Sequence, residues 1–236
     1  MRAPLAWLSA DGKKLLVTRI LRTFAYGYLA VVLAIYLQEI GLDEVRIGIV
    51  LTAAIAGSAV MTTAWALVAD RYGRRRTVQT MAVLMVVGGL LFALAGDFWL
   101  LLLGAFTGTI SATSSEVGAF LTVEQAVLPQ TAPPEKRTWL FSIYAMVASF
   151  AQAAGSLFAG AVSAFVALGL HGADAYRPLF LLYALVGLAN LAVFLTLSDR
   201  VELAHVDGVR RFLGIDRSRT TVVRLSALFG VDSFAG

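Results

Sequence analysis

The sequence predicts an all-α integral membrane protein built as a six-helix transmembrane bundle. Of its 236 residues, 59% are apolar and only 14% are charged, and the mean hydropathy is +0.80. Soluble domains are about half apolar and a quarter charged, so a water-soluble globule is excluded. The apolar residues also form long runs rather than the alternating ~10-residue segments of a membrane barrel. Together these observations favour helices that cross a bilayer.

Six apolar runs are long enough to cross a hydrocarbon core of roughly 30 Å, which needs ~20 helical residues. The fourth run is expected to form one continuous helix, like the others. The first run is too long for a signal-peptide core and lacks a small-residue cleavage pattern, so it should be a retained span. The runs make up a predicted N-terminal bundle over residues 1–197: Leu15–Leu37, Ile47–Ala69, Val78–Gly96, Trp99–Leu128, Trp139–Leu170 and Leu179–Leu197.

The chain after the sixth run has two parts. Residues 198–220 form a charged link, and residues 221–236 begin a seventh apolar run. A helix that stopped at residue 236 would leave its last carbonyls unsatisfied in hydrocarbon. We therefore expect the chain to be the front part of a longer protein whose second half is missing. The alternative is a six-span protein with a disordered or re-entrant tail.

Lysines and arginines crowd into every second connection between the runs. Fourteen lie on the side of the N-terminus and of the charged link, whereas only Arg46 and Arg177 lie on the other side. The positive-inside rule therefore predicts a multi-pass protein of the cell (inner) membrane with a cytoplasmic N-terminus. The sequence pI of 9.6 does not indicate nucleic acid binding, because the basic residues form no continuous stripe.

Several kinds of chemistry are excluded by composition. The chain has no cysteine, so disulfides, thiolate metal sites and cysteine nucleophiles are ruled out. Its two histidines, His171 and His205, both fall in expected loops. An intramembrane hydrolase would need a Ser/His pair, facing aspartates or a zinc site within the spans. We therefore expect no enzyme activity, no catalytic residue, no metal and no cofactor.

A basic turn joins the second and third runs. Alone, its four arginines would be only a positive-inside anchor. However, Asp70 stands at a helix C-terminus, where the helix dipole disfavours a negative charge, so it should have a cationic partner or a neighbouring helix N-terminus. Gly73 permits the positive φ of a tight turn, and arginine side chains suit carboxylates on a facing helix. The turn reads Ala66-Leu67-Val68-Ala69-Asp70-Arg71-Tyr72-Gly73-Arg74-Arg75-Arg76.

This turn resembles the signature of the major facilitator superfamily, Gly-x-Leu-Ala-Asp-Arg-x-Gly-Arg-Lys. Asp70, Arg71, Gly73 and Arg74 are in register, Arg75 stands for the lysine, and Ala66 and Val68 replace the first glycine and the leucine. The resemblance extends to the topology of the whole chain. Six helices, a charged link and the start of a seventh helix match the first half of such a transporter. It implies that the aspartate and the arginines latch a cytoplasmic gate. The arginine that many members carry early in helix four is missing, as is the Gly-Pro step of drug/proton antiporters, so that subgroup is not expected.

Charged side chains within the spans are candidate binding residues, since each costs several kcal/mol without a partner, a cavity or a function. Counting helical rise places Arg22 and Glu116 at one level in the inner third of the bilayer. Arg19 is expected one helical turn closer to the cytoplasm. Glu124 is expected roughly 12 Å beyond Glu116, at the cytoplasmic interface. Helices one and four line the central cavity in the family that the chain resembles. We therefore expect an Arg22–Glu116 pair, or Arg19–Glu116, in that cavity; the alternative is that both arginines snorkel to the surface.

Other candidates have weaker support. Glu116 follows a hydroxyl-rich tract, residues 107–115. This tract indicates either the wall of a water-filled cavity or a helix-packing surface. A carboxylate in an apolar wall can also carry protons. Asp232 would lie ~15 Å into the seventh run, near the substrate depth of such transporters, and is otherwise a loop residue. Tyr26 could contact a solute or simply pack.

Together these features predict a secondary active transporter that moves a small solute by alternating access, with proton coupling through Glu116 as a hypothesis. The expected partners are the lipid bilayer, a small-molecule solute, protons and the missing C-terminal half, but no nucleic acid. The alternative is a non-transporting membrane sensor or scaffold with a transporter-like fold.

Overall fold

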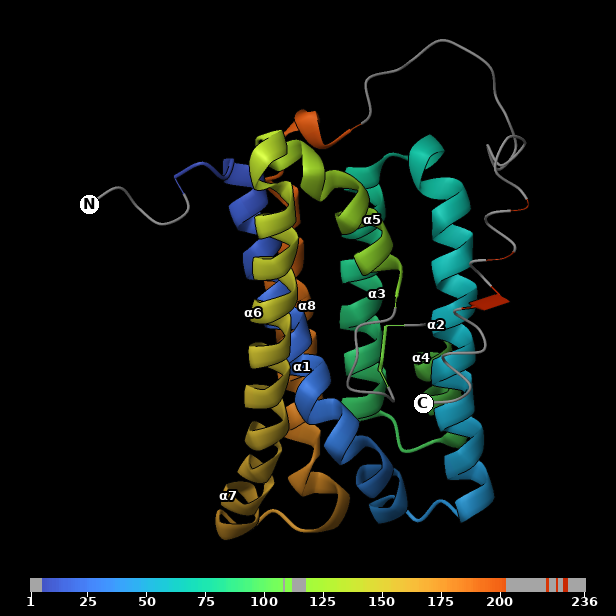
Figure 1. Ribbon diagram of the computed structural model, residues 1–236. Helices are drawn as coiled ribbons and strands as arrows, with labels where there is room; N and C mark the ends of the chain where they lie inside the picture. Colours follow the sequence, from blue (N-terminus) through green and yellow to red (C-terminus); the bar gives the residue numbers. More distant parts are fainter. Residues whose placement is uncertain are drawn as a thin grey trace. The chain divides into compact units, whose positions relative to one another are not determined.

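The computed structural model describes residues 6–107, 109–111 and 118–202, and also residues 220, 224, 227 and 228. At positions 70, 119 and 200 it describes the backbone alone. Contacts divide the chain into two units, Met1–Leu203 and Ala204–Gly236. The first unit is the bundle of helices in Figure 1.

All the regular elements among the described residues of this bundle are helices, and these residues contain no strand, as the sequence predicts. The helices are α1 (Ala10–Glu39), α2 (Glu44–Tyr72), α3 (Arg74–Leu94), α4 (Phe98–Phe106), α5 (Ala119–Val127), α6 (Arg137–Phe158), α7 (Val162–Ala167) and α8 (Arg177–Leu195). Short 3-10 turns occur at η1 (Leu128–Thr131), η2 (Pro134–Lys136), η3 (Ala159–Ala161), η4 (Gly172–Ala175) and η5 (Asp199–Val201).

Within the described part of the chain, five segments are long and apolar enough to cross a membrane. They begin and end close to the first, second, third, fifth and sixth predicted runs, which confirms the all-α membrane bundle. They are Ala10–Glu39, Glu44–Ala69, Arg74–Leu94, Pro134–Ala167 and Gly172–Leu195.

The fourth predicted run differs from the expected continuous helix. It forms two helices of nine residues each, α4 and α5, and residues 109–111 between them are not helical. Both short helices pack against α2 and α3, one nearer each end of the bundle (Figure 1). The prediction of one helix over Trp99–Leu128 is therefore wrong.

Side chains hold the break between α4 and α5 in place. The Tyr183 hydroxyl donates a hydrogen bond to the carbonyl of Thr109. The hydroxyls of Thr107 and Thr109 lie 2.9 Å apart, and the Thr109 hydroxyl lies 3.4 Å from the carbonyl of Leu84 in α3. Serine and threonine hydroxyls offer the backbone alternatives to the helical ladder, so this hydroxyl-rich tract tolerates the break. Irregular backbone is tolerated at membrane depth when it is buried in protein, and Thr109 is 6% exposed.

Glycines allow α1 and α6 to approach closely. A methyl group added at Gly27 of α1 would lie 2.2 Å from the carbonyl oxygen of Gln152, and one added at Gly155 of α6 would lie 2.0 Å from that of Phe24. The Ser156 hydroxyl lies 3.2 Å from the carbonyl oxygen of Gly27. Contact of this kind between backbones is typical of helices that pack through small residues in membranes.

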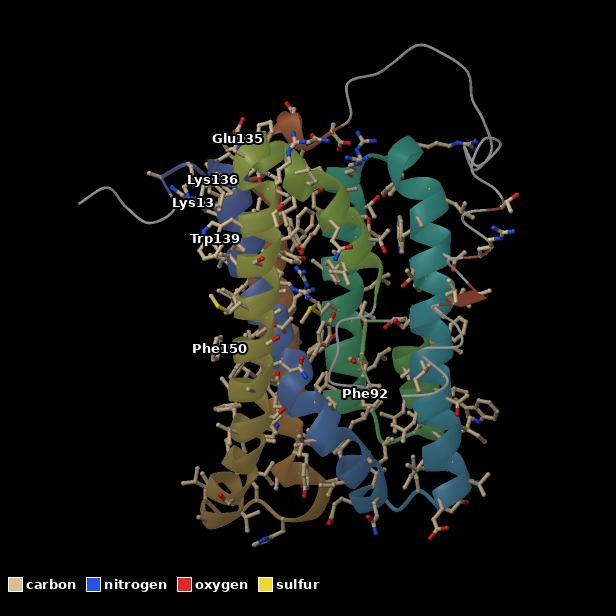
Figure 2. All side chains as sticks on the ribbon, in the orientation of Figure 1. Lys13, Phe92, Glu135, Lys136, Trp139 and Phe150 are labelled. Atoms are coloured by element: carbon tan, nitrogen blue, oxygen red, sulfur yellow. The ribbon has the colours of Figure 1, made fainter. Side chains whose placement is uncertain are left out.

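An aromatic cluster fills the bundle between α1, α3 and α8. The Phe92 and Phe180 rings stack with centroids 5.3 Å apart, and the Tyr36 ring lies 4.5 Å from that of Phe180. The Tyr36 hydroxyl bonds to the carbonyl of Phe92, which Figure 2 labels. All three side chains are fully buried.

We call the end of the bundle that carries the turn at Gly73 the basic end. There, side chains of α1 and α3 cover the last carbonyls of α8, which a helix cannot satisfy by itself. Gln79 donates to the carbonyl of Phe194 at 3.2 Å, Arg75 to that of Leu195 at 2.8 Å, and Lys14 to that of Thr196 at 2.5 Å. Two of these donors are cations, which the negative end of the helix dipole favours.

Candidate functional site: a buried ion pair and a capped basic turn

An ion pair is buried where α1, α5 and α6 meet. The Arg22 Nη2 atom lies 2.7 Å from the Glu124 Oε2 atom, and neither side chain is exposed. The Tyr144 hydroxyl donates to the same carboxylate oxygen at 2.5 Å. The Thr18 hydroxyl, one turn before Arg22 on α1, lies 3.5 Å from the Glu124 Oε1 atom. Three segments distant in sequence are therefore joined through one carboxylate.

Aromatic rings enclose this pair. The Arg22 guanidinium lies 4.4 Å from the Phe120 ring centroid and 5.8 Å from that of Phe194. Arg19, which is 8% exposed, places its guanidinium 4.6 Å over the Tyr144 ring. Cation–π contacts strengthen when the cation is desolvated, and hydrogen bonds strengthen in a low dielectric. The cluster can therefore hold charge inside the bundle, away from water.

The position of Glu124 corrects the sequence-based expectation. We expected it at the cytoplasmic interface, but it is 1% exposed and bonded to Arg22. The depth estimate assumed an unbroken helix rising 1.5 Å per residue, and the break after α4 invalidates that assumption. Snorkelling of Arg22 to the surface is excluded by the same burial. The expected partner, Glu116, and the candidate Asp232 lie outside the described residues.

Tyr26 lies in the packed interior beside the break. It is 4% exposed, and its ring centroid is 6.2 Å from that of Tyr183, which holds the Thr109 carbonyl. Its contact with a solute stays a prediction.

The turn between α2 and α3 has the geometry that the sequence predicts. Gly73 has φ of 103°, the left-handed region that favours glycine. Arg71 is exposed, whereas Arg74 is buried and its Nη1 atom lies 3.3 Å from the carbonyl oxygen of Ala126. The side chain of Asp70 lies outside what the structure describes.

Two acidic residues that sequence analysis missed cap this turn. The carboxylate of Glu202 accepts from the backbone N–H groups of Arg74 at 2.8 Å and Arg75 at 3.0 Å. Asp199 lies 3.1 Å from the guanidinium of Arg75. Carboxylates are favourable at a helix N-terminus because its first N–H groups lack partners. The signal available in the sequence was an Asp-x-x-Glu spacing directly after the sixth run, on the same predicted side as the arginines.

Comparison with known proteins agrees with this architecture. Residues 15–233 match the family model described as the Major Facilitator Superfamily. The chain is also 33% identical over 198 residues to an uncharacterized membrane protein of Saccharomyces cerevisiae, a match that covers 83% of this chain and 44% of the relative. The chain thus spans less than half the length of that relative. On this match, and with a basic turn and apolar spans of the corresponding kind, the chain belongs to the Major Facilitator Superfamily of membrane transporters.

Proposed function

We propose that this chain forms part of a secondary active transporter that moves a small solute by alternating access, and that Glu124 couples the movement to protons. Family membership supports transport in general. The observation that carries the finer proposal is the fully buried Arg22–Glu124 pair.

The physical reason for this assignment is that a buried pair of opposite charges is far less costly than a single buried charge. Two opposite charges can share a dry site, but removal of one leaves the other uncompensated at a cost of about 3–5 kcal/mol. A proton on Glu124 removes one charge that Arg22 faces, so the arrangement that buries Arg22 becomes less favourable. The favoured response is a rearrangement in which Arg22 regains water or another anion. Proton binding thus shifts the balance between two arrangements of α1 and α5, as coupling requires.

This proposal divides the candidate residues by role. Because aromatic rings seal the Arg22–Glu124 pair, we assign it to coupling rather than to direct solute contact. Glu116, Asp232 and Tyr26 remain candidates for the solute site, and Glu116 remains a second candidate for proton binding.

We also propose that the basic end is the cytoplasmic gate. The basic turn of α3, held by Asp199 and Glu202, forms one side of that gate in the cell (inner) membrane, and the second half of the transporter supplies the other. The N-terminus is then cytoplasmic, in agreement with the charge count of the connections.

The test begins by identifying the solute. Solutes whose cellular content changes on deletion or overexpression of the full-length gene are found by mass spectrometry. Uptake of the identified solute is then measured against pH in proteoliposomes. We expect Glu124→Gln to abolish the pH dependence of uptake while Glu135→Gln, an exposed residue, leaves it intact.

Two results would argue against the proposal. An unchanged pH profile in Glu124→Gln would remove the coupling role of this residue. If no solute changes in content although the protein is made and membrane-inserted, the non-transporting sensor or scaffold is the better reading.

A further inference from the structure

Asn190 of α8 is a fully buried amide that the coupling proposed above does not use. Its side chain is 0% exposed, and its Nδ2 atom donates to the carbonyl of Val186, one turn earlier, at 2.9 Å. Its Oδ1 atom is also buried and accepts no hydrogen bond from the described residues. A buried acceptor without a donor is costly, because it has lost its water and gained no partner. This oxygen is therefore available to a donor that another arrangement of the bundle supplies.

Helix geometry directs Asn190 toward α1. It lies seven residues after Tyr183, almost two full turns, so the two side chains leave α8 in nearly the same direction. The Tyr183 ring contacts that of Tyr26 in α1, with centroids 6.2 Å apart. The two helices also pack against each other along their length. The amide thus belongs to the face of α8 that meets α1.

The Arg22 guanidinium lies one turn of α8 away from this amide. Phe194 follows Asn190 by four residues, so the two side chains are neighbours on α8, with Cβ atoms roughly 5–6 Å apart. The Arg22 guanidinium lies 5.8 Å from the Phe194 ring centroid. Tyr26, which meets Tyr183, is one turn after Arg22 on α1. Two contacts with α1 therefore bracket Asn190 along α8.

The groups around Arg22 leave few acceptors for it other than Glu124. Among the described residues, the charged or titratable groups that interact with it are Glu124 of α5, Tyr144 of α6, and Arg19 and Tyr26 of α1. Arg19 is a second cation, and the Tyr144 hydroxyl already donates to Glu124. α8 carries no carboxylate. An amide oxygen on α8 can still accept a charge-assisted hydrogen bond, which is stronger than a neutral one.

We propose that Asn190 is the second hydrogen-bond acceptor of Arg22, used when Glu124 has taken up a proton. Arg22 then turns its guanidinium from the Glu124 carboxylate to the Asn190 oxygen, so the cation keeps a partner without leaving the bundle. Asn190 is thus a positioning residue that favours the protonated arrangement. This inference rests on the proton coupling proposed above and names the partner that α8 supplies to it.

The contact can be tested without a solute, by thermal inactivation half-lives of the purified protein in detergent. Asn190→Leu is made in the unsubstituted protein and in Glu124→Leu. In the first it removes an oxygen that accepts nothing from the described residues, so the half-life should stay equal or lengthen. In the second, Arg22 depends on that oxygen, so the half-life should shorten several-fold. A side chain that only packs would change both half-lives by the same factor.

Asn190→Asp tests the same contact by charge. In Glu124→Leu it supplies the missing carboxylate, so we expect a several-fold longer half-life than for Glu124→Leu alone. The matched control is the same substitution in a protein that carries both Arg22→Met and Glu124→Leu. There the new carboxylate lacks the cation it is meant to meet, so the half-life should shorten.

Uptake of the solute identified above gives a readout that packing would not move. Loss of the Asn190 oxygen disfavours the protonated arrangement, so more acid is needed to reach it. Asn190→Leu should therefore shift the midpoint of the pH dependence to lower pH by about one unit, the size expected for one hydrogen bond to a charged group. Glu135→Gln, at an exposed position, should leave the midpoint unchanged.

Four results would overturn the inference. Equal factors for Asn190→Leu in the two backgrounds would mean that this side chain only packs. A half-life of Glu124→Leu that Asn190→Asp does not lengthen would show that position 190 does not reach Arg22. A lengthening that persists without Arg22 would assign the contact to another cation. An unshifted midpoint in Asn190→Leu would remove its role in coupling. The expected half-lives without uptake of any solute would instead support the contact and overturn the transport proposal.

Discussion

Arg22 and Glu124 both lose their hydration in the folded bundle, and their mutual attraction offsets part of that loss. The hydroxyl of Tyr144 and the rings of Phe120 and Phe194 surround the pair with groups that favour charge but supply none of their own. Buried pairs of this kind contribute little net stability compared with apolar residues of similar volume, yet they are costly to break. At the scale of residues, the pair is better suited to switching between arrangements than to stabilising one of them.

Removal of one partner should therefore destabilise the bundle more than removal of both. We expect Arg22→Met and Glu124→Leu each to cost about 3–5 kcal/mol, and the double variant to recover most of that loss. The measurement is the thermal inactivation half-life of the purified protein in detergent, because membrane proteins seldom unfold reversibly. Strictly additive losses in the double variant would show that the two side chains do not interact.

The Tyr144 hydroxyl makes a smaller contribution, which can be measured separately. A hydrogen bond to a charged group contributes about 1.5–3 kcal/mol, so Tyr144→Phe should shorten the same half-life by less than either charge removal. A half-life equal to that of the unsubstituted protein would mean that the hydroxyl does not bond to Glu124 in solution.

At the scale of helices, the bundle depends on close backbone approach at a few points and on capped helix ends. Gly27 and Gly155 bring α1 against α6, and this contact places the Tyr144 ring of α6 beside the Arg19 guanidinium of α1. The basic turn is held by Glu202, which satisfies the first N–H groups of α3. These two features position the ion pair and the proposed gate respectively.

Gly155→Ala should separate α1 from α6, because its methyl group would lie 2.0 Å from a backbone oxygen that cannot move alone. We expect a loss of more than about 3 kcal/mol, seen as a lower yield of monodisperse protein in size-exclusion chromatography. Gly160→Ala, with open surroundings among the described residues, should change stability by less than about 0.5 kcal/mol. Equal yields for the two variants would contradict the close α1–α6 contact.

Loss of the Glu202 carboxylate should loosen the start of α3. Removal of an N-terminal cap costs about 0.5–2 kcal/mol, so Glu202→Ala should speed hydrogen exchange at the amides of Arg74 and Arg75. The matched control is Glu135→Ala, which removes an exposed carboxylate and should leave α3 unchanged. Unchanged exchange in both variants would mean that other groups satisfy these N–H groups.

Much of this arrangement could be predicted from the sequence, and the reasons for the failures are physical. Length and hydropathy identify spans reliably because the bilayer demands both, and a turn at Gly73 follows from the residues around it. The level of Glu124 could not be found by counting, because two hydrogen bonds to distant parts of the chain hold the break in the fourth span. The Tyr183 hydroxyl donates to the Thr109 carbonyl, and the Thr109 hydroxyl donates to the Leu84 carbonyl. The cap by Glu202 was missed for the same reason, since the whole of α3 to α8 separates Glu202 from Arg74 in the sequence.

At the scale of the whole molecule, the spans differ in how far the bundle covers them. In the most apolar part of α1, 61% of residues are buried, against 17% in α2 and 17% in the segment that contains α6 and α7. α1 therefore forms the centre of the bundle, and α2 and α6 present most of their surface outward. An outward surface of this extent suits lipid or a second half of the transporter, and both are partners in the proposed function.

The topology can be tested without background labelling because the chain has no cysteine. Gly96→Cys lies in the turn between α3 and α4, and Glu135→Cys lies between α5 and α6, in connections predicted on opposite sides. In intact cells, a membrane-impermeant maleimide should label the first variant and should reach the second only after permeabilisation. The reverse pattern would invert the proposed orientation and place the basic turn outside.

The break in the fourth span also has a consequence for biogenesis. During synthesis, residues 99–128 leave the ribosome about 55 residues before Tyr183, which later donates a hydrogen bond to the Thr109 carbonyl. Until that hydroxyl is present, an unwound backbone in lipid would leave the Thr109 carbonyl without this partner, at a cost of several kcal/mol. The nascent segment should therefore enter the membrane as an unbroken rod and unwind only after the last helix of the bundle has been inserted. The break between α4 and α5 should then form late in synthesis, after α8 has entered the membrane.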